Sequence, residues 1–242
     1  MKTRADLLLV ARGLFDSRAK ARAAIEAGGV TADGRRVAKA SELLADDAAL
    51  QAVPAHPWVG RGALKLVHAF ELWPVGVDER VVLDVGASTG GFTEVCLGRG
   101  AVRVYAVDVG RGQLHPRVAA DPRVISLEAT DARDLTPAIV GDPPGLVVAD
   151  VSFISLEKAL PAALALAQPG AELVALVKPQ FEVGRGKVGK GGIVTDEAAR
   201  LGALEAVKAF LGGIGWTVRA TADSPIEGGD GNREFLLWAA FG

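Results

Sequence analysis

The stretch that most constrains this chain is VVLDVGASTGGFT, which covers residues 81–93. Its apolar, β-branched beginning is typical of a buried strand, and glycines follow at positions 86, 90 and 91. Residues 92–100 then have helical spacing and end on a glycine. A strand, a glycine-rich turn and a helix in this order begin a nucleotide-binding α/β unit. The glycines let the backbone approach a ligand, and the first helical turn offers free N–H donors.

The spelling of the turn separates three kinds of ligand. A dinucleotide fold requires G-x-G-x-x-G, but Ser88 stands at the second glycine. A P-loop requires a lysine followed by Ser or Thr, but Phe92 and Thr93 follow the last glycine. The pattern D-x-G-x-x-x-G-G suits S-adenosylmethionine, whose ammonium group can meet a carboxylate such as Asp84. A glycine turn without a specific ligand remains the alternative from this stretch alone.

Further strands are expected at residues 103–110, 124–130, 145–155 and 171–181, with helical runs between them, notably at 156–167. This alternation predicts a doubly wound parallel sheet, with ligands at the C-terminal ends of its strands. The ends of the first five strands carry ionisable residues, namely Asp84, Asp108, Asp131, Asp150 and Lys178. Asp108 is suited to the ribose hydroxyls of an adenosine ligand, and Asp131 to the amino group of its adenine.

The last third of the chain predicts one long helix and a hairpin. Thr195 is expected to cap a helix over residues 196–211. Strands at 216–226 and 233–241, joined by a glycine loop at 228–231, should complete the sheet, with Glu234 at the start of the last strand.

The beginning of the chain has a different charge from the rest. Residues 1–40 hold nine Lys and Arg against four acidic residues, a net charge of +5 in a chain whose total is −2. Two short helices separated by Gly13 are followed by a hairpin that turns at Asp33 and Gly34. This asymmetry indicates a basic module attached to a more acidic body.

The basic module resembles the alpha-L RNA-binding motif of ribosomal protein S-four. The matching pattern, R-x-D-x-x-L-x-x-x-G-L-x-x-S-R-x-x-A-x-x-x-I-x-x-G-x-V-x-x-x-G, lies within residues 4–52. A solvated basic helical hairpin is the alternative. The basic residues expected to bind RNA phosphates here are Arg4, Arg18, Lys20, Arg22, Arg35 and Arg36.

Composition excludes several classes of protein. The single cysteine, Cys96, permits no internal disulfide and predicts an intracellular protein. No apolar run reaches the roughly 18 residues of a membrane span, so we expect a cytoplasmic protein without a membrane partner. The histidines at positions 56, 68 and 115 lack metal-ligand spacing, so no metal is expected.

Two further motifs exclude other chemistry. Cys96 falls inside a helix, which argues against a pyrimidine-carbon methyltransferase with a nucleophilic cysteine at a strand edge. GRGKVGK at residues 184–190 resembles a P-loop, but Gly191 replaces the Ser or Thr that would hold magnesium. We expect instead a flexible basic flap over a polyanionic substrate. The additional residues expected to bind RNA are Arg61, Arg185 and Lys187.

A ribose 2′-hydroxyl is the acceptor that remains. Its pKa lies far above 7, so it must be held in line with the methyl group and lose its proton as the bond forms. A lysine can take this proton if burial or a second ammonium lowers its pKa. Lys178, with Lys65 nearby, offers this arrangement, and Asp150 and Glu234 can orient the two lysines.

These four residues match, in order and context, the K-D-K-E tetrad of FtsJ-like ribose methyltransferases. In addition, GRGALKL, DVGASTGGFTE, VADVSFISL and VKPQFEVG are similar to the TlyA (hemolysin A) family. Members of this family join an alpha-L module to an FtsJ-like domain and make 2′-O-methylcytidine in ribosomal RNA.

The resemblance implies a Rossmann-like, mostly parallel seven-stranded sheet and a small N-terminal α+β domain. The expected boundaries are an RNA-binding domain at 1–53, a linker at 54–60 and a methyltransferase domain at 61–242. The expected substrate is large-subunit RNA, with small-subunit RNA as an alternative and no obligate protein partner. The expected catalytic residues are Lys65, Asp150, Lys178 and Glu234. The residues expected to bind S-adenosylmethionine are Asp84, Gly86, Ser88, Thr89, Gly90, Gly91, Phe92, Asp108, Asp131 and Asp150.

Three other functions remain as alternatives. A membrane-acting hemolysin is suggested by the family's second name, but no apolar span supports it. A non-catalytic RNA-binding factor for ribosome assembly would not need the complete K-D-K-E set. A small-molecule methyltransferase would leave the basic first 40 residues without a purpose.

Overall fold

The structure, a computed structural model, describes residues 1–228 and 231–242 and divides into two units, residues 1–57 and 58–242. Each unit has its own hydrophobic core. The core of the first unit is built only from residues between Ala5 and Ala52, and those of the second lie between Trp58 and Phe241. Each unit therefore buries its apolar side chains within its own residues.

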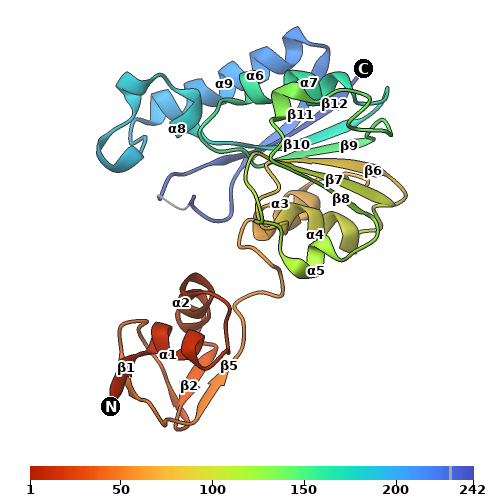
Figure 1. The fold of residues 1–242 in the computed structure, drawn as a ribbon. Helices are drawn as coiled ribbons and strands as arrows, with labels where there is room; N and C mark the ends of the chain where they lie inside the picture. Colours follow the sequence, from red (N-terminus) through yellow and green to blue (C-terminus); the bar gives the residue numbers. More distant parts are fainter. Residues whose placement is uncertain (229–230) are drawn as a thin grey trace. The chain divides into compact units, whose positions relative to one another are not determined.

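The first unit contains two short helices and two small sheets (Figure 1). Its elements are β1 (Lys2–Arg4), α1 (Ala5–Ala11), α2 (Arg18–Glu26), β2 (Val30–Ala32), β3 (Arg35–Arg36), β4 (Leu43–Ala45) and β5 (Leu50–Ala52). The predicted Asp33–Gly34 turn is confirmed, because both residues have positive φ angles of 50° and 77° between the antiparallel β2 and β3. Ser17 caps α2 by accepting a hydrogen bond from the backbone N–H of Lys20, as expected for its first turn.

The second unit is a seven-stranded sheet covered by helices. In chain order, its elements up to β9 are α3 (Ala63–Leu72), β6 (Val81–Val85), α4 (Gly91–Gly98), β7 (Arg103–Asp108), α5 (Pro116–Ala119), β8 (Val124–Glu128), η1 (Ala132–Asp134) and β9 (Leu146–Ala149). Those that follow are α6 (Leu156–Ala159), α7 (Pro161–Ala165), β10 (Glu172–Val177), α8 (Pro179–Glu182), η2 (Arg185–Lys187), η3 (Lys190–Gly192), α9 (Glu197–Gly213), β11 (Trp216–Asp223) and β12 (Phe235–Phe241).

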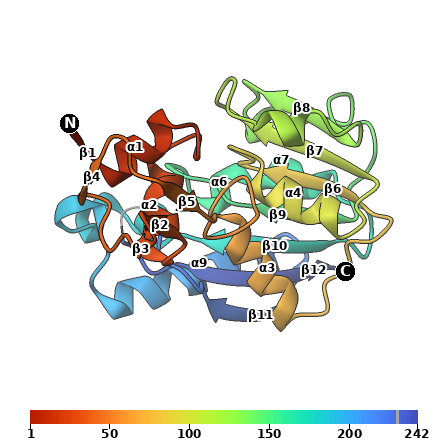
Figure 2. The same ribbon diagram turned by 90° about the horizontal axis from the view of Figure 1, so that it is seen from below.

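The strands lie in the order β11-β12-β10-β9-β6-β7-β8, which Figure 2 shows from one edge of the sheet to the other. The five strands from β10 to β8 are parallel, and β12 is antiparallel to both of its neighbours. Helices α3, α4 and α5 cover one face, and α6, α7 and α9 cover the other (Figure 1). The predicted doubly wound, mostly parallel sheet is confirmed. Its topology changes direction between β6 and β9, which is where ligands bind in such sheets.

Two local predictions were wrong. The single helix expected over residues 156–167 is broken into α6 and α7, because Pro161 has no N–H to donate to the hydrogen-bond ladder of the helix. Asp196, and not Thr195, caps α9, since its Oδ1 accepts a hydrogen bond of 2.9 Å from the backbone N–H of Ala198. The predicted hairpin of β11 and β12 is confirmed, although part of its glycine loop, residues 229–230, lies outside the described residues.

Among the described residues, no helix is long and apolar enough to cross a membrane.

Candidate functional site

The loop after β6 has a shape that only glycine permits at two positions. Gly86 and Gly90 have φ angles of +87° and +89°. A Cβ on Gly86 would lie 2.7 Å from the carbonyl oxygen of Asp150, and a Cβ on Gly90 would lie 2.8 Å from Leu114. The loop therefore passes directly over the end of β9 and leads into the N-terminus of α4.

The segment before α3 packs closely on this loop. A Cβ on Gly60 would lie 2.7 Å from Oγ1 of Thr89, and a Cβ on Gly91 would lie 3.2 Å from the backbone nitrogen of Ala63. The predicted loop residues Gly90, Gly91 and Phe92 are buried, whereas Ser88 and Thr89 are exposed. This contact brings the start of α3, which carries Lys65, against the glycine-rich loop.

A cavity of about 1120 Å³ opens at the C-terminal ends of the parallel strands. Of the residues predicted to bind the cofactor, those that line it are Gly86, Ser88, Asp108, Asp131 and Asp150. The cavity continues past the segment after β9 to α8, where Phe153, Phe181 and Glu182 line it. The structure thus brings together the carboxylates that the sequence places at separate strand ends.

Asp84 is the exception among these carboxylates. Its side chain is fully buried within β6 and does not line the cavity. Oδ2 accepts a hydrogen bond of 2.6 Å from the hydroxyl of Thr93, while Oδ1 has no partner among the described residues. Burial raises the pKa of Asp84 to about 7. A direct contact between this carboxylate and an ammonium group therefore stays a prediction.

Two of the carboxylates that line the cavity, Asp108 and Asp131, have partners close to them. Asp108 accepts hydrogen bonds from the backbone N–H groups of Ser88 and Gly110, at 2.8 and 2.7 Å, so it ties the glycine-rich loop to the loop after β7. Asp131 forms an ion pair with Arg133 at 2.6 Å, and this pair lowers the pKa of the Asp131 carboxyl to about 2. At neutral pH Asp131 is therefore a charged acceptor at the cavity wall.

The four tetrad residues form two ion pairs. Nζ of Lys65 lies 2.5 Å from Oε2 of Glu234, and both side chains are almost completely buried. Nζ of Lys178 lies 2.6 Å from Oδ1 of Asp150, at the ends of the neighbouring strands β10 and β9. Each lysine thus has one carboxylate partner.

The two pairs are linked through the start of α3. A Cβ on Gly62 would lie 3.3 Å from Oδ2 of Asp150, and the N–H of Lys65 donates to the carbonyl of Gly62 at 2.9 Å. Helix α3, which carries Lys65 of one pair, therefore begins beside Asp150 of the other pair. A substitution by a larger residue at Gly62 would disturb both.

Two residues of this site were missed from the sequence. Oγ of Ser152 accepts a hydrogen bond of 2.9 Å from Nζ of Lys178. Phe153 is 91% exposed at the cavity, has a positive φ of 67°, and lies with its ring 5.2 Å from that of Phe181. The signal was present in VADVSFISL, where a serine and an aromatic residue closely follow the strand-end Asp150.

The basic residues of the first unit are held by acidic neighbours. Arg4 and Arg18 both bind the buried carboxylate of Asp6, at 2.9 and 2.8 Å, and these guanidinium groups hold the pKa of Asp6 well below its usual range. The other ion pairs of this kind join Lys20 to Asp16, Arg22 to Glu26 and Arg35 to Glu42. Most of this side-chain surface is still exposed, so RNA binding by these residues stays a prediction.

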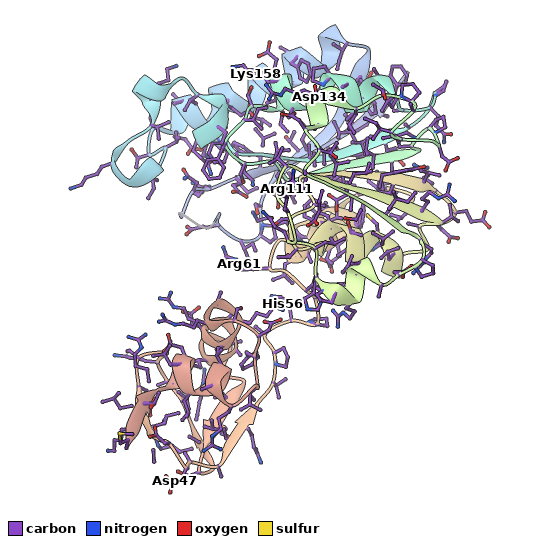
Figure 3. The ribbon with its side chains drawn as sticks, viewed as in Figure 1. Asp47, His56, Arg61, Arg111, Asp134 and Lys158 are labelled. Atoms are coloured by element: carbon purple, nitrogen blue, oxygen red, sulfur yellow. The ribbon has the colours of Figure 1, made fainter. Side chains whose placement is uncertain are left out.

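The basic residues predicted in the second unit have fewer contacts. Arg61, labelled in Figure 3, donates a hydrogen bond of 3.3 Å to the carbonyl of Glu227. Lys187 is exposed in η2, and the side chain of Arg185 lies outside the described part of the structure. Cys96 is buried in α4, where burial raises its pKa well above the usual thiol value, so it is not a nucleophile. No group of three potential metal ligands occurs among the described residues.

Comparisons with known proteins agree with this geometry. Residues 58–241 match the FtsJ-like methyltransferase family, and residues 3–48 match the S4 domain. The chain is 48% identical to the 16S/23S rRNA (cytidine-2'-O)-methyltransferase TlyA of Mycobacterium tuberculosis over 98% of its own length and 89% of that protein.

Two further relatives carry the name hemolysin. Hemolysin A of Brachyspira hyodysenteriae is 37% identical, over 96% of this chain and 98% of that protein. A solved structure from Streptococcus thermophilus, also named as a hemolysin, has a TM-score of 0.78 at 40% identity and covers 99% of this chain and 88% of that one.

The cavity fits S-adenosylmethionine, the methyl donor of this family. Its glycine-rich loop has no room for side chains at Gly86, and its wall carries Asp108 and Asp131 as acceptors for hydroxyl and amino groups. The predictions of family, fold and cofactor are confirmed. The chain therefore belongs to the TlyA group of FtsJ-like methyltransferases, which use S-adenosylmethionine and carry an N-terminal S4 domain.

Proposed function

We propose that this protein transfers a methyl group from S-adenosylmethionine to the ribose 2′-hydroxyl of a cytidine in ribosomal RNA. The observation that carries this proposal is the pair of lysine–carboxylate contacts, Lys178 with Asp150 and Lys65 with Glu234, beside the glycine-rich loop. Large-subunit RNA is the expected substrate, with small-subunit RNA as the alternative. In this proposal residues 1–53 bind RNA, residues 54–60 are the linker and residues 61–242 carry out the transfer.

The tetrad can supply the acid–base chemistry of this reaction. S-adenosylmethionine supplies a methyl group bonded to a positively charged sulfur. Lys178, in its neutral form, takes the proton of the 2′-hydroxyl, and Asp150 then stabilises the ammonium that results. Ser152, which lines the cavity, accepts a hydrogen bond from Nζ of Lys178 and so orients this group beside Asp150. Lys65, held by Glu234, keeps a positive charge beside the oxygen as that oxygen loses its proton.

The surroundings of the tetrad support a nucleotide as substrate. The exposed ring of Phe153 lines the cavity that Asp150 also lines, and it offers a flat apolar face. Proteins that modify single nucleotides in RNA stack the extruded base on such rings. The S4 domain supports a polynucleotide over a free nucleoside, and a ribosomal substrate would place the reaction in the cytoplasm.

A transfer assay with separated ribosomal subunits tests the proposal. Purified protein is incubated with radiolabelled S-adenosylmethionine and unmodified small or large subunits, and the RNA is digested to nucleosides. We expect label in 2′-O-methylcytidine. Lys178→Ala should lower the rate at least about 100-fold, because it removes the base. Lys208→Ala, at a half-buried lysine of α9 that pairs with Glu205, is the matched control and should keep full activity.

Two outcomes would contradict the proposal. Label on a base would show that the tetrad does not act on the ribose. An absence of label on both subunits, with RNA binding intact, would favour a non-catalytic RNA-binding factor.

A further inference from the structure

The segment between α8 and α9, residues 184–194, is here called the basic flap. It carries exposed Lys187 and Lys190 among five glycines. Such a glycine-rich chain has a large conformational entropy, so it needs specific contacts to take one position. Within the flap, the backbone N–H of Gly189 donates to the carbonyl of Ile193 at 2.9 Å, which closes a small loop inside the flap itself.

Among the described residues, the buried side chain of Asn232 makes two hydrogen bonds to the end of the flap. Asn232 is 1% exposed, and its Nδ2 donates a hydrogen bond of 2.9 Å to the carbonyl of Gly192. Its Oδ1 accepts a hydrogen bond of 3.0 Å from the backbone N–H of Val194. The amide thus uses a donor and an acceptor on alternate residues of the flap, as a neighbouring strand would.

Asn232 stands two residues before Glu234. The side chain of Glu234 forms the ion pair with Lys65, and its carbonyl accepts a hydrogen bond of 2.9 Å from the N–H of Ser224. The carbonyl of Asn232 itself accepts one from the N–H of Gly228, also at 2.9 Å. The same short stretch of backbone therefore holds the end of the flap and one half of the tetrad.

We infer that Asn232 is a positioning residue that fixes the basic flap relative to the Lys65–Glu234 pair. In this arrangement Lys187 and Lys190 hold the phosphates of a polynucleotide at a set distance from the reacting ribose. The RNA part of the inference rests on the proposed function, whereas the attachment of the flap does not.

The substitution of Asn232 has a defined physical effect. Asn232→Ala leaves the buried N–H of Val194 and the carbonyl of Gly192 without partners, so the end of the flap must open to water to satisfy them. Asn232→Asp keeps the acceptor for Val194 but places a carboxylate oxygen against the carbonyl of Gly192. Ser224→Ala is the matched control, because Ser224 bonds the carbonyl of Ile226 in the same loop and does not contact the flap.

Hydrogen exchange of the full chain without RNA tests the attachment. In Asn232→Ala, peptides covering residues 184–194 should exchange at least about tenfold faster, which corresponds to the loss of a tether of roughly 1.4 kcal/mol. Asn232→Asp should also exchange faster, because its carboxylate repels the carbonyl of Gly192, and Ser224→Ala should show no increase. Unchanged exchange in Asn232→Ala would overturn the inference.

A double-mutant cycle tests the coupling to RNA. Lys187→Ala with Lys190→Ala should raise KM for ribosomal RNA about tenfold in the parent protein, but less than about twofold in Asn232→Ala, where the lysines are no longer held in place. A merely structural role of Asn232 would give additive effects in this cycle, and that result would overturn the inference. The affinity for S-adenosylmethionine should stay unchanged throughout.

The two proposals can fail separately. If the parent protein methylates no RNA, the proposed function fails, and the same cycle is then measured with RNA-binding affinity in place of KM. The exchange experiment judges the attachment in either case.

Discussion

At the scale of single residues, Asp84 stands out as a carboxyl group that is completely buried in the core of the sheet. Its carboxyl group has no exposed surface and accepts a hydrogen bond from the hydroxyl of Thr93, and burial raises its pKa from 3.8 to about 7. The folded protein therefore binds a proton between pH 4 and pH 7 that the unfolded chain has released. The stability linked to this proton is fully present below pH 4 and is lost as the pH rises to 7.

We expect Asp84→Asn to remove this loss, because the amide is neutral at every pH. The free energy of unfolding of the variant should rise relative to the parent by about 4 kcal/mol between pH 4 and pH 7, and stay level above that range. Urea denaturation across this range measures the difference. Asp134→Asn, at an exposed carboxylate of the same unit, is the control. Parallel pH profiles for Asp84→Asn and the parent would contradict the prediction.

At the scale of elements, the loop between β6 and α4 depends on backbone shape as much as on side chains. Gly86 combines a φ of +87° with a distance of 2.7 Å from its would-be Cβ to the carbonyl of Asp150. We expect Gly86→Ala to weaken S-adenosylmethionine binding at least about tenfold and to destabilise the protein by roughly 1–3 kcal/mol. Calorimetry and thermal unfolding measure these effects.

The matched control for this prediction is Gly202→Ala on α9. Gly202 is exposed and a Cβ there would have no atom within 4 Å, so the substitution should stabilise the helix by about 1 kcal/mol and leave binding unchanged. Equal behaviour of the two variants would show that the loop tolerates side chains and that its glycines have no special role.

At the scale of the whole molecule, the separate cores predict separable functions. No core residue is shared between residues 1–57 and residues 58–242. A protein of residues 58–242 should therefore fold and bind S-adenosylmethionine with the affinity of the full chain. It should bind ribosomal RNA more weakly, with a shallower dependence on salt, because it releases fewer counterions. Binding isotherms at several salt concentrations test this, and equal salt slopes would show that the first unit does not contact phosphates.

Local sequence patterns predicted which helices and strands form more accurately than they predicted the residues at which these elements begin and end. The glycine-rich turn and the order of strands and helices follow from hydrophobic periodicity and from glycine positions, which act over a few residues. The break at Pro161 was also visible locally and was missed because the apolar spacing continues across it. The cap of α9 fell one residue from its predicted place, which is the usual uncertainty between adjacent polar residues.

The sequence alone was enough to indicate a doubly wound sheet, a methyl-donor loop and a basic N-terminal module, since each is written in a continuous stretch of chain. It also named the four tetrad residues, through their resemblance to a known pattern. Only the tertiary structure decided which lysine pairs with which carboxylate, that Asp84 is sealed from the cavity, and that Ser152, Phe153 and Asn232 adjoin the site or its flap. These contacts join residues far apart in the chain, such as Lys65 and Glu234, and their geometry depends on how the helices and loops pack on the sheet.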